Sequence, residues 1–84
     1  MLVKVYGYGC EKHDRLYKNA IQAANQMDLE ANVIKILDNE KIAEAGFNYT
    51  PGLAIDDEPL VTGRVLTVDE LKILFRRYQK VVVG

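Results

Sequence analysis

Some segments of this chain have the short β-rich apolar runs of strands, and others have apolar residues every three or four positions, as in helices. The changes between the two patterns divide the chain into short elements. Residues 2–6 ("LVKVY") are rich in β-forming side chains and lead into Gly7 and Gly9, which predicts a first strand that ends in a turn. From residue 11 to about residue 28, apolar side chains recur every three or four positions, which predicts an amphipathic helix.

A second strand and a short second helix follow in the pattern. Residues 31–37 ("ANVIKIL") are rich in β-branched side chains and predict the strand. Residues 40–46 ("EKIAEAG") predict the helix, with the Asp38-Asn39 pair as its N-terminal cap and Gly46 ending it in the left-handed conformation.

The next two apolar runs are too short for helices. Residues 52–55 ("GLAI") and 59–62 ("PLVT") are separated by Asp56-Asp57-Glu58, a spacing that predicts an antiparallel hairpin. Pro59 indicates that the second of these strands lies at an edge of the sheet.

A last helix has the clearest start in the sequence. Thr67 and Glu70 form a capping box, Leu66 and Leu71 can form the hydrophobic staple that accompanies it, and an apolar stripe continues toward residue 78. The tail 80–84 ("KVVVG") fits an edge strand, a subunit contact or packing beneath the last helix, and Val81–Val83 have no assigned role.

The predicted order is therefore βαβαββα, in one α/β domain over residues 1–84 with no repeat, linker or low-complexity segment. A right-handed parallel crossover followed by a hairpin gives a four-stranded mixed sheet with three helices. The carboxyl end of the first strand then lies at one rim of the sheet, where α/β folds place their chemistry. Cys10 lies at that rim.

Composition narrows the classes of partner. Eleven basic and twelve acidic side chains are mixed along the 84 residues, which argues against nucleic acid. No apolar run is long enough to cross a membrane, and "MLVKVYGYG" does not resemble a secretory signal, so we expect a cytoplasmic protein.

Cys10 is the only cysteine, and His13 the only histidine. At the N-terminus of a helix, the dipole favours a thiolate, as do Lys12 and His13, whereas Glu11 and Asp14 oppose it. His13 lies one helical turn from Cys10, where it can hydrogen-bond a thiolate or take a proton from a thiol. Two simpler interpretations stay open: Cys10 as a small inert filler, and His13 as a solvated helix residue.

Several other thiol chemistries do not fit the spacing. A phosphatase loop has five residues between its cysteine and arginine, whereas four separate Cys10 from Arg15, and Glu11 and Asp14 would repel phosphate. A papain-like site takes its base from elsewhere in the fold. Cys10 and His13 supply two ligands where structural zinc needs four, so a metal site would require a two-fold dimer, and we predict no metal.

The element order, the turn "GYGC" and the segment "TPGLAIDDEPLVTGRVLTVDELKILF" resemble the small thioredoxin-like, glutaredoxin-sized proteins called redox-active disulfide protein 2. The resemblance runs from residue 2 to about residue 76. It implies a thioredoxin-like fold in which Cys10 is the attacking cysteine. It also implies that Thr50 and a cis Pro51 contact the backbone of a bound substrate. The sequence departs from the family's C-x-x-C motif because His13 replaces the second cysteine.

Two functions are compatible with this departure. In the first, Cys10 performs monothiol thiol-disulfide exchange on a protein or small-thiol disulfide, His13 assists as the second catalytic residue, and an external thiol such as glutathione resolves the product, with no other cofactor. In the second, the chain is a non-catalytic binding module that has lost the redox dithiol. We expect a monomer, with a dimer through Cys10 as a further alternative.

Overall fold

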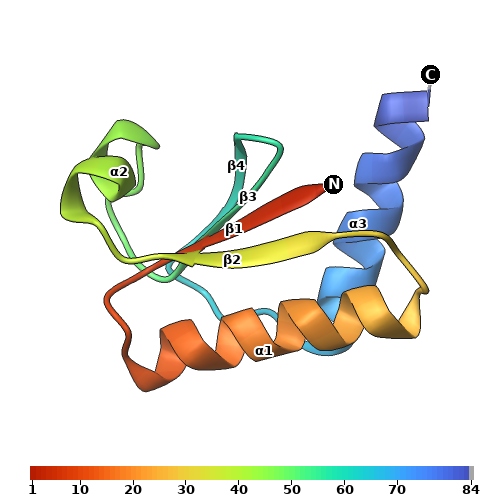
Figure 1. Ribbon diagram of the computed structural model, residues 1–84, viewed down its shortest axis with the longest axis horizontal. Helices are drawn as coiled ribbons and strands as arrows, with labels where there is room; N and C mark the ends of the chain where they lie inside the picture. Colours follow the sequence, from red (N-terminus) through yellow and green to blue (C-terminus); the bar gives the residue numbers. More distant parts are fainter. Residues whose placement is uncertain (84) are drawn as a thin grey trace.

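The computed structural model describes the backbone of residues 1–83 and the side chains of residues 1–79. Seven elements follow one another in the predicted order (Figure 1). They are β1 (Leu2–Tyr6), α1 (Glu11–Gln26), β2 (Asn32–Ile36), α2 (Asn39–Glu44), β3 (Gly52–Ile55), β4 (Glu58–Thr62) and α3 (Val68–Val83).

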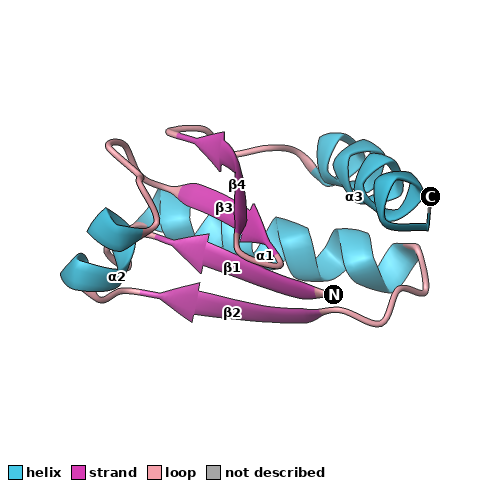
Figure 2. Cartoon of the chain, turned by 90° about the horizontal axis from the view of Figure 1, so that it is seen from above, coloured by secondary structure: helices cyan, strands magenta, loops and turns pink. Residues whose placement is uncertain are grey.

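The four strands form one mixed sheet in the order β2-β1-β3-β4 (Figure 2). β1 is parallel to β2, with Val3 opposite Val33, and antiparallel to β3, with Val5 opposite Leu53. β3 and β4 form the antiparallel hairpin, which leaves β4 at one edge. The predicted α/β class and mixed sheet are confirmed.

Element ends differ from the predictions by one or two residues. The two-residue turn of the hairpin holds Asp56 and Asp57 alone, both with positive φ (48° and 69°), and β4 therefore begins at Glu58. Such a turn matches the twist of the strands that it joins. α1 ends at Gln26, two residues before Asp28 takes a φ of 53°.

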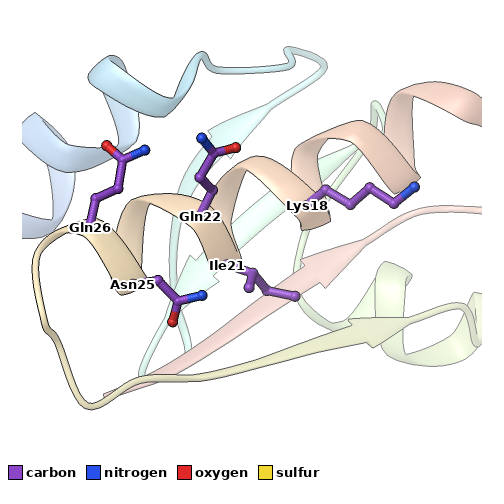
Figure 3. A pocket seen from close by; sticks show the side chains of 5 residues that line it. All are labelled: Lys18, Ile21, Gln22, Asn25 and Gln26. Atoms are coloured by element: carbon purple, nitrogen blue, oxygen red, sulfur yellow. The ribbon is translucent and has the colours of Figure 1, made fainter.

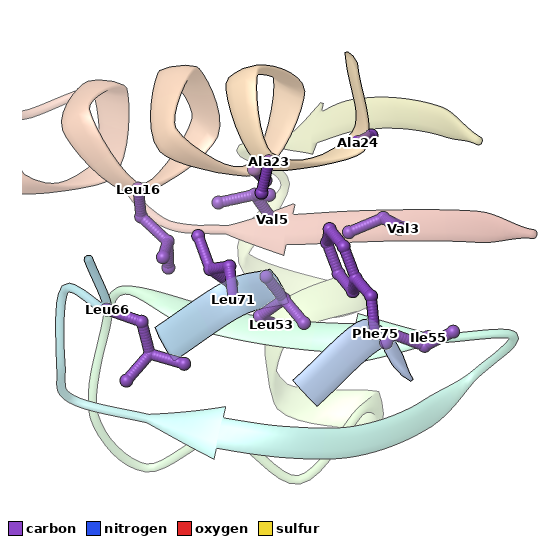
Figure 4. Packing of buried hydrophobic residues seen from close by; sticks show 11 residues of the cluster. Val3, Val5, Leu16, Ala23, Ala24, Leu53, Ile55, Leu66, Leu71 and Phe75 are labelled. Atoms are coloured by element: carbon purple, nitrogen blue, oxygen red, sulfur yellow. The ribbon is translucent and has the colours of Figure 1, made fainter. Parts of the chain in front are cut away.

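One face of the sheet carries the main core, with α1 and α3 packed against β1 and β3 (Figure 4). Leu16 and Phe75 are fully buried between these helices and the sheet. The small, fully buried side chains of Ala20 and Ala23 let α1 pack close to the rest of this core. The remaining buried members of this core are Val3, Val5, Ala24, Leu53, Ile55, Leu66 and Leu71.

Among the residues that the structure describes, the opposite face is covered by the six-residue α2 and the loop that follows it (Figure 1). Tyr6, Ile42, Phe47 and Ala54 form a second small cluster there, with the Tyr6 and Phe47 rings 4.8 Å apart between centroids. Asp38 caps α2 by accepting from two backbone N–H groups. The predicted left-handed end at Gly46 is confirmed, with φ 86°.

α3 begins at the predicted capping box. Thr67 N–H donates to the Glu70 carboxylate (3.0 Å), and Glu70 N–H donates to the Thr67 hydroxyl (3.2 Å). The Thr67 N–H holds the pKa of Glu70 below its usual value. α3 runs to Val83, so an edge strand at residues 80–84 is wrong as far as the backbone is described. The other two roles expected for Val81–Val83, a subunit contact and packing beneath the last helix, depend on side chains outside the described residues. Gly84 also lies outside them.

Within the described part of the chain, no helix combines the length and the apolar character that a bilayer span requires.

The capping box predicts a measurable stability effect. Thr67→Ala removes the hydroxyl acceptor and is expected to lower the free energy of unfolding by about 1 kcal/mol. Glu70→Gln keeps an acceptor for the Thr67 N–H and is expected to cost less. Urea unfolding followed by circular dichroism compares the two variants. Equal losses would contradict the role given to the Thr67 hydroxyl.

Candidate functional site

The residues singled out in the sequence lie at one end of the sheet. Tyr6, the last residue of β1, is opposite Gly52, the first residue of β3. The turn that follows β1 and the Thr50-Pro51 segment that precedes β3 therefore leave the sheet at the same end. The fold thus brings the cysteine turn and the proline loop to one rim.

Cys10 is exposed and occupies the N-cap position of α1, with extended backbone angles (φ −76°, ψ 174°). Its carbonyl accepts the first intrahelical bond, from Asp14 N–H at 3.0 Å. Its side chain makes no capping hydrogen bond to the free N–H groups of the first turn. The sulfur is therefore accessible to solvent and is not committed to a structural bond.

His13, one turn further on, is fully buried. Gly9 N–H lies 3.0 Å from Nδ1, and the Val5 carbonyl oxygen lies 2.7 Å from Nε2. A backbone N–H can only donate and a carbonyl can only accept. Nδ1 must therefore be the acceptor, and Nε2 must carry the proton. Both ring nitrogens are occupied by the backbone, and neither is free to donate to the Cys10 sulfur.

Burial of the imidazole depends on a glycine in the preceding turn. A Cβ atom at Gly7 would lie 2.5 Å from Cγ of His13, closer than real atoms approach. Gly7 therefore leaves the space that the ring fills. The expectation that His13 is a solvated helix residue is wrong, because the helix turns this position toward β1 and the backbone satisfies both nitrogens.

Thr50 and Pro51 are joined by a cis peptide bond. Pro51 is buried, and Thr50 is partly exposed. The loop is tied to β4 at two points, since Gly63 N–H donates to the Pro51 carbonyl (2.8 Å) and the Thr62 hydroxyl donates to the Tyr49 carbonyl (3.1 Å).

Sequence reasoning missed three exposed apolar side chains in the loops at this end, namely Tyr8, Leu37 and Tyr49. Tyr8 is two residues from Cys10, and Tyr49 directly precedes Thr50. A Cβ atom at Gly9 would lie 3.3 Å from Cδ2 of Leu37, so Leu37 borders the cysteine turn. Tyr8 and Tyr49 could have been found as apolar residues outside any helical or strand period, whereas Leu37 was placed in the predicted strand 31–37, which ends one residue earlier, at Ile36.

Asp14 ties the first turn of α1 to the neighbouring strand. Its carboxylate accepts from Lys35 on β2 (2.9 Å) and pairs with Lys18 (3.0 Å). The Lys35 ammonium, which also lies 5.0 Å from the Tyr17 ring centroid, is the larger cause that holds the pKa of Asp14 below its usual value, and Lys18 acts in the same direction. The carboxylate is therefore neutralised locally and repels an anion near Cys10 less than the sequence suggests.

A separate hollow lies on the outer side of α1, toward its C-terminal end (Figure 3). Its side chains all come from one helix: Lys18, Ile21, Gln22, Asn25 and Gln26. Apart from Lys18, which is paired with Asp14, none of them is a nucleophile, acid or base. In the described residues, no cluster of three or more histidine, cysteine or acidic side chains is arranged to hold a metal ion.

A mixed four-stranded sheet with a cysteine at the N-terminus of its first long helix, opposite a proline loop, defines a thioredoxin-like protein. The chain belongs to the thioredoxin domain family, whose sequence model matches residues 1–76. It is 39% identical over 72 residues to a thioredoxin of Methanothermobacter thermautotrophicus strain Delta H, covering 86% of this chain and 94% of that protein. It is 32% identical over 78 residues to a thioredoxin of Methanocaldococcus jannaschii, covering 93% and 90%.

The buried imidazole predicts a large stability effect at position 13. His13→Ala leaves a cavity and two unpaired backbone groups, and should cost about 3 kcal/mol or more of unfolding free energy. His13→Phe fills the space but still leaves Val5 and Gly9 unpaired, at about 1–3 kcal/mol. Lys12→Ala, at the exposed neighbouring position, should stay within about 0.5 kcal/mol.

Denaturant unfolding measures these differences, and ¹⁵N NMR of the imidazole identifies the tautomer. A proton on Nδ1 at neutral pH would contradict the bonding described.

The lowered pKa of Asp14 predicts a pH-dependent contribution to stability. The folded state favours the ionised carboxylate, so the contribution is present above the unfolded pKa of about 3.9 and disappears as pH falls through the lower folded value. Lys35→Met should therefore destabilise the protein more at pH 7 than at pH 2. Urea unfolding at both pH values, with the exposed Lys12→Met as control, measures the difference. A pH-independent loss would indicate that only the contact with Tyr17 matters.

Proposed function

We propose that this thioredoxin-like protein performs thiol-disulfide exchange with Cys10 as its only sulfur nucleophile, and that an external thiol completes each cycle. The observation that supports it most strongly is the pairing of an exposed, uncommitted Cys10 with a His13 that is buried one turn away and bonded to the backbone through both nitrogens. The position of a second thiol is thus filled by a group that does not react with disulfides.

The cycle has two exchange steps. The Cys10 thiolate attacks a disulfide, forms a mixed disulfide with one half, and releases the other half as a thiolate that takes a proton from water. An external thiolate then attacks the mixed disulfide, forms a new disulfide with the bound half, and restores the Cys10 thiolate. No electrons are lost or gained overall, and a reducing compartment such as the cytoplasm would supply the thiol, with glutathione as the candidate.

His13 is assigned a positioning role in this cycle. Because it binds the N–H of Gly9, directly before Cys10, it fixes the turn that presents the sulfur. Acid catalysis by His13 toward a leaving thiol is less well supported, since the ring would have to give up the bond to Gly9 or to Val5.

The proline loop and its neighbours fit a substrate-binding role. Thr50 and Pro51 lie at the same end of the sheet as Cys10, and the exposed Tyr8 and Tyr49 add apolar surface in the cysteine turn and in the proline loop. A protein disulfide offers apolar surface to match, whereas a small disulfide does not. We therefore favour a protein as the substrate class.

The same apolar surface favours a second candidate, a non-catalytic binding module. The chain has a single cysteine, and the rim keeps the exposed Tyr8, Leu37 and Tyr49 whether or not the thiol reacts. In that case Cys10→Ser would capture the same partner as the parent chain, and Tyr49→Ser would lose it.

Exchange with glutathione disulfide distinguishes the two functions. The reduced protein should acquire one glutathione on Cys10, seen as an adduct by mass spectrometry, faster than free cysteine reacts at the same pH. The adduct should persist until glutathione is added and then decay at a rate proportional to its concentration. His13→Cys should instead discharge the adduct without added thiol, as an internal disulfide forms and glutathione leaves.

Two controls complete this experiment. His13→Ser loses the same packing as His13→Cys but has no second thiol, so its adduct should persist. Non-reducing electrophoresis separates a glutathione adduct from a dimer through Cys10. Reaction no faster than that of free cysteine, with glutathione disulfide and with a protein disulfide alike, would reject the exchange function and leave the binding module. A wild-type adduct that decays independently of glutathione would reject external resolution.

A further inference from the structure

β4 is an edge strand whose last residue, Thr62, is open for pairing. It pairs with β3 on one side only (Figure 2). Because Gly63 N–H points inward to the Pro51 carbonyl, the alternation of an antiparallel ladder turns the N–H and C=O of Thr62 outward. Glu58, Pro59 and the register shift that leaves Leu60 without a partner on β3 obstruct pairing along most of the strand, as is usual for protected edges, and Thr62 at its end is free of these features.

The second half of this edge, residues 60–62, is hollowed on both faces of the sheet. Leu60, Val61 and Thr62 line one groove together with residues of α3, and they line a second groove together with the loop 46–49. α3 covers the face of the main core and Phe47 belongs to the cluster on the other face, so the two grooves lie on opposite sides. Side chains of an added strand alternate between the two faces, and each set would find a groove.

The chemistry of the two grooves differs. The α3 groove has an apolar floor that includes Leu66 and Leu74, with Ile73 exposed beside it. Its rim carries two arginines. Arg64 forms an ion pair with Glu70 (3.3 Å), and Arg77 has no ion-pair partner among the side chains of residues 1–79. Arg77 is therefore available to a carboxylate. The other groove is lined by Phe47, Asn48 and Tyr49 and carries no charged side chain.

We propose that β4 accepts an extended segment of another protein as a fifth strand, with its backbone paired to Thr62. Alternate apolar side chains of that segment enter the α3 groove and the Phe47 groove, and an acidic side chain pairs with Arg77. This binding does not use the Cys10 thiol. It would dock a partner along the edge of the sheet, beside the proposed substrate-binding surface, with which it shares Tyr49.

Selection from a display library of random ten-residue peptides tests the proposal. The target is the full-length Cys10→Ser chain, so that exchange plays no part. We expect enriched peptides with alternating apolar residues and at least one acidic residue. Arg77→Glu should weaken their binding at least tenfold, as measured by fluorescence anisotropy. Arg76→Glu, on the same helix but outside the groove, should change it less than twofold.

A second pair of variants tests the backbone pairing. Thr62→Pro removes the outward N–H, at a position where an edge strand tolerates proline, and should also weaken binding at least tenfold. Thr62→Val loses only the hydroxyl and should bind within twofold of the parent. Circular dichroism checks the fold of each variant, and Arg77→Glu decides the outcome if Thr62→Pro does not fold.

Three outcomes would overturn the proposal. They are the absence of enriched peptides, enriched peptides that bind Arg77→Glu as tightly as the parent, and a chain that sediments as a dimer which Arg77→Glu dissociates. In the last case the edge belongs to a second copy of the chain.

Discussion

The imidazole of His13 joins the central strand to the start of the first helix. Its protonated nitrogen donates to the carbonyl of Val5 within β1, and its other nitrogen accepts from Gly9 in the turn. These two bonds cross the point where the chain changes from strand to helix, so they fix the direction in which α1 leaves the sheet. The exposure of Cys10 and the placement of Leu16 in the core both follow from that direction.

The two faces of the sheet are supported unequally. α1 and α3, with 16 residues each, bury a continuous apolar core against one face. The other face depends on six residues of α2 and on the ring of Phe47, which lies against Gly52 and Tyr6. The Phe47 loop leads directly into Thr50 and Pro51. Packing on the weaker face therefore positions half of the candidate site, while the stronger face positions Cys10.

Most of the fold could be predicted because its signals are local. The capping box at Thr67, the cap at Asp38 and the period of α1 each require only neighbouring residues, and the structure confirms them. The burial of His13 could not be predicted in this way. The burial of His13 depends on the space left by Gly7 and on backbone groups of β1 and the turn, which are not its neighbours in the helix. Its charged sequence neighbours, such as Glu11 and Lys12, indicate an exposed position instead. The exposed tyrosines of the rim were missed because they belong to no period.

Gly7 and His13 share one volume, so the two positions cannot vary independently. A side chain at position 7 would collide with the ring, and a smaller residue at position 13 would leave a void beneath the turn. A cysteine introduced at position 13 would thus supply a second thiol but remove the packing that holds the turn. Positions 7 and 13 are therefore constrained as a pair: a smaller residue at position 13 is accommodated best together with a larger residue at position 7, or with a turn that closes in another way.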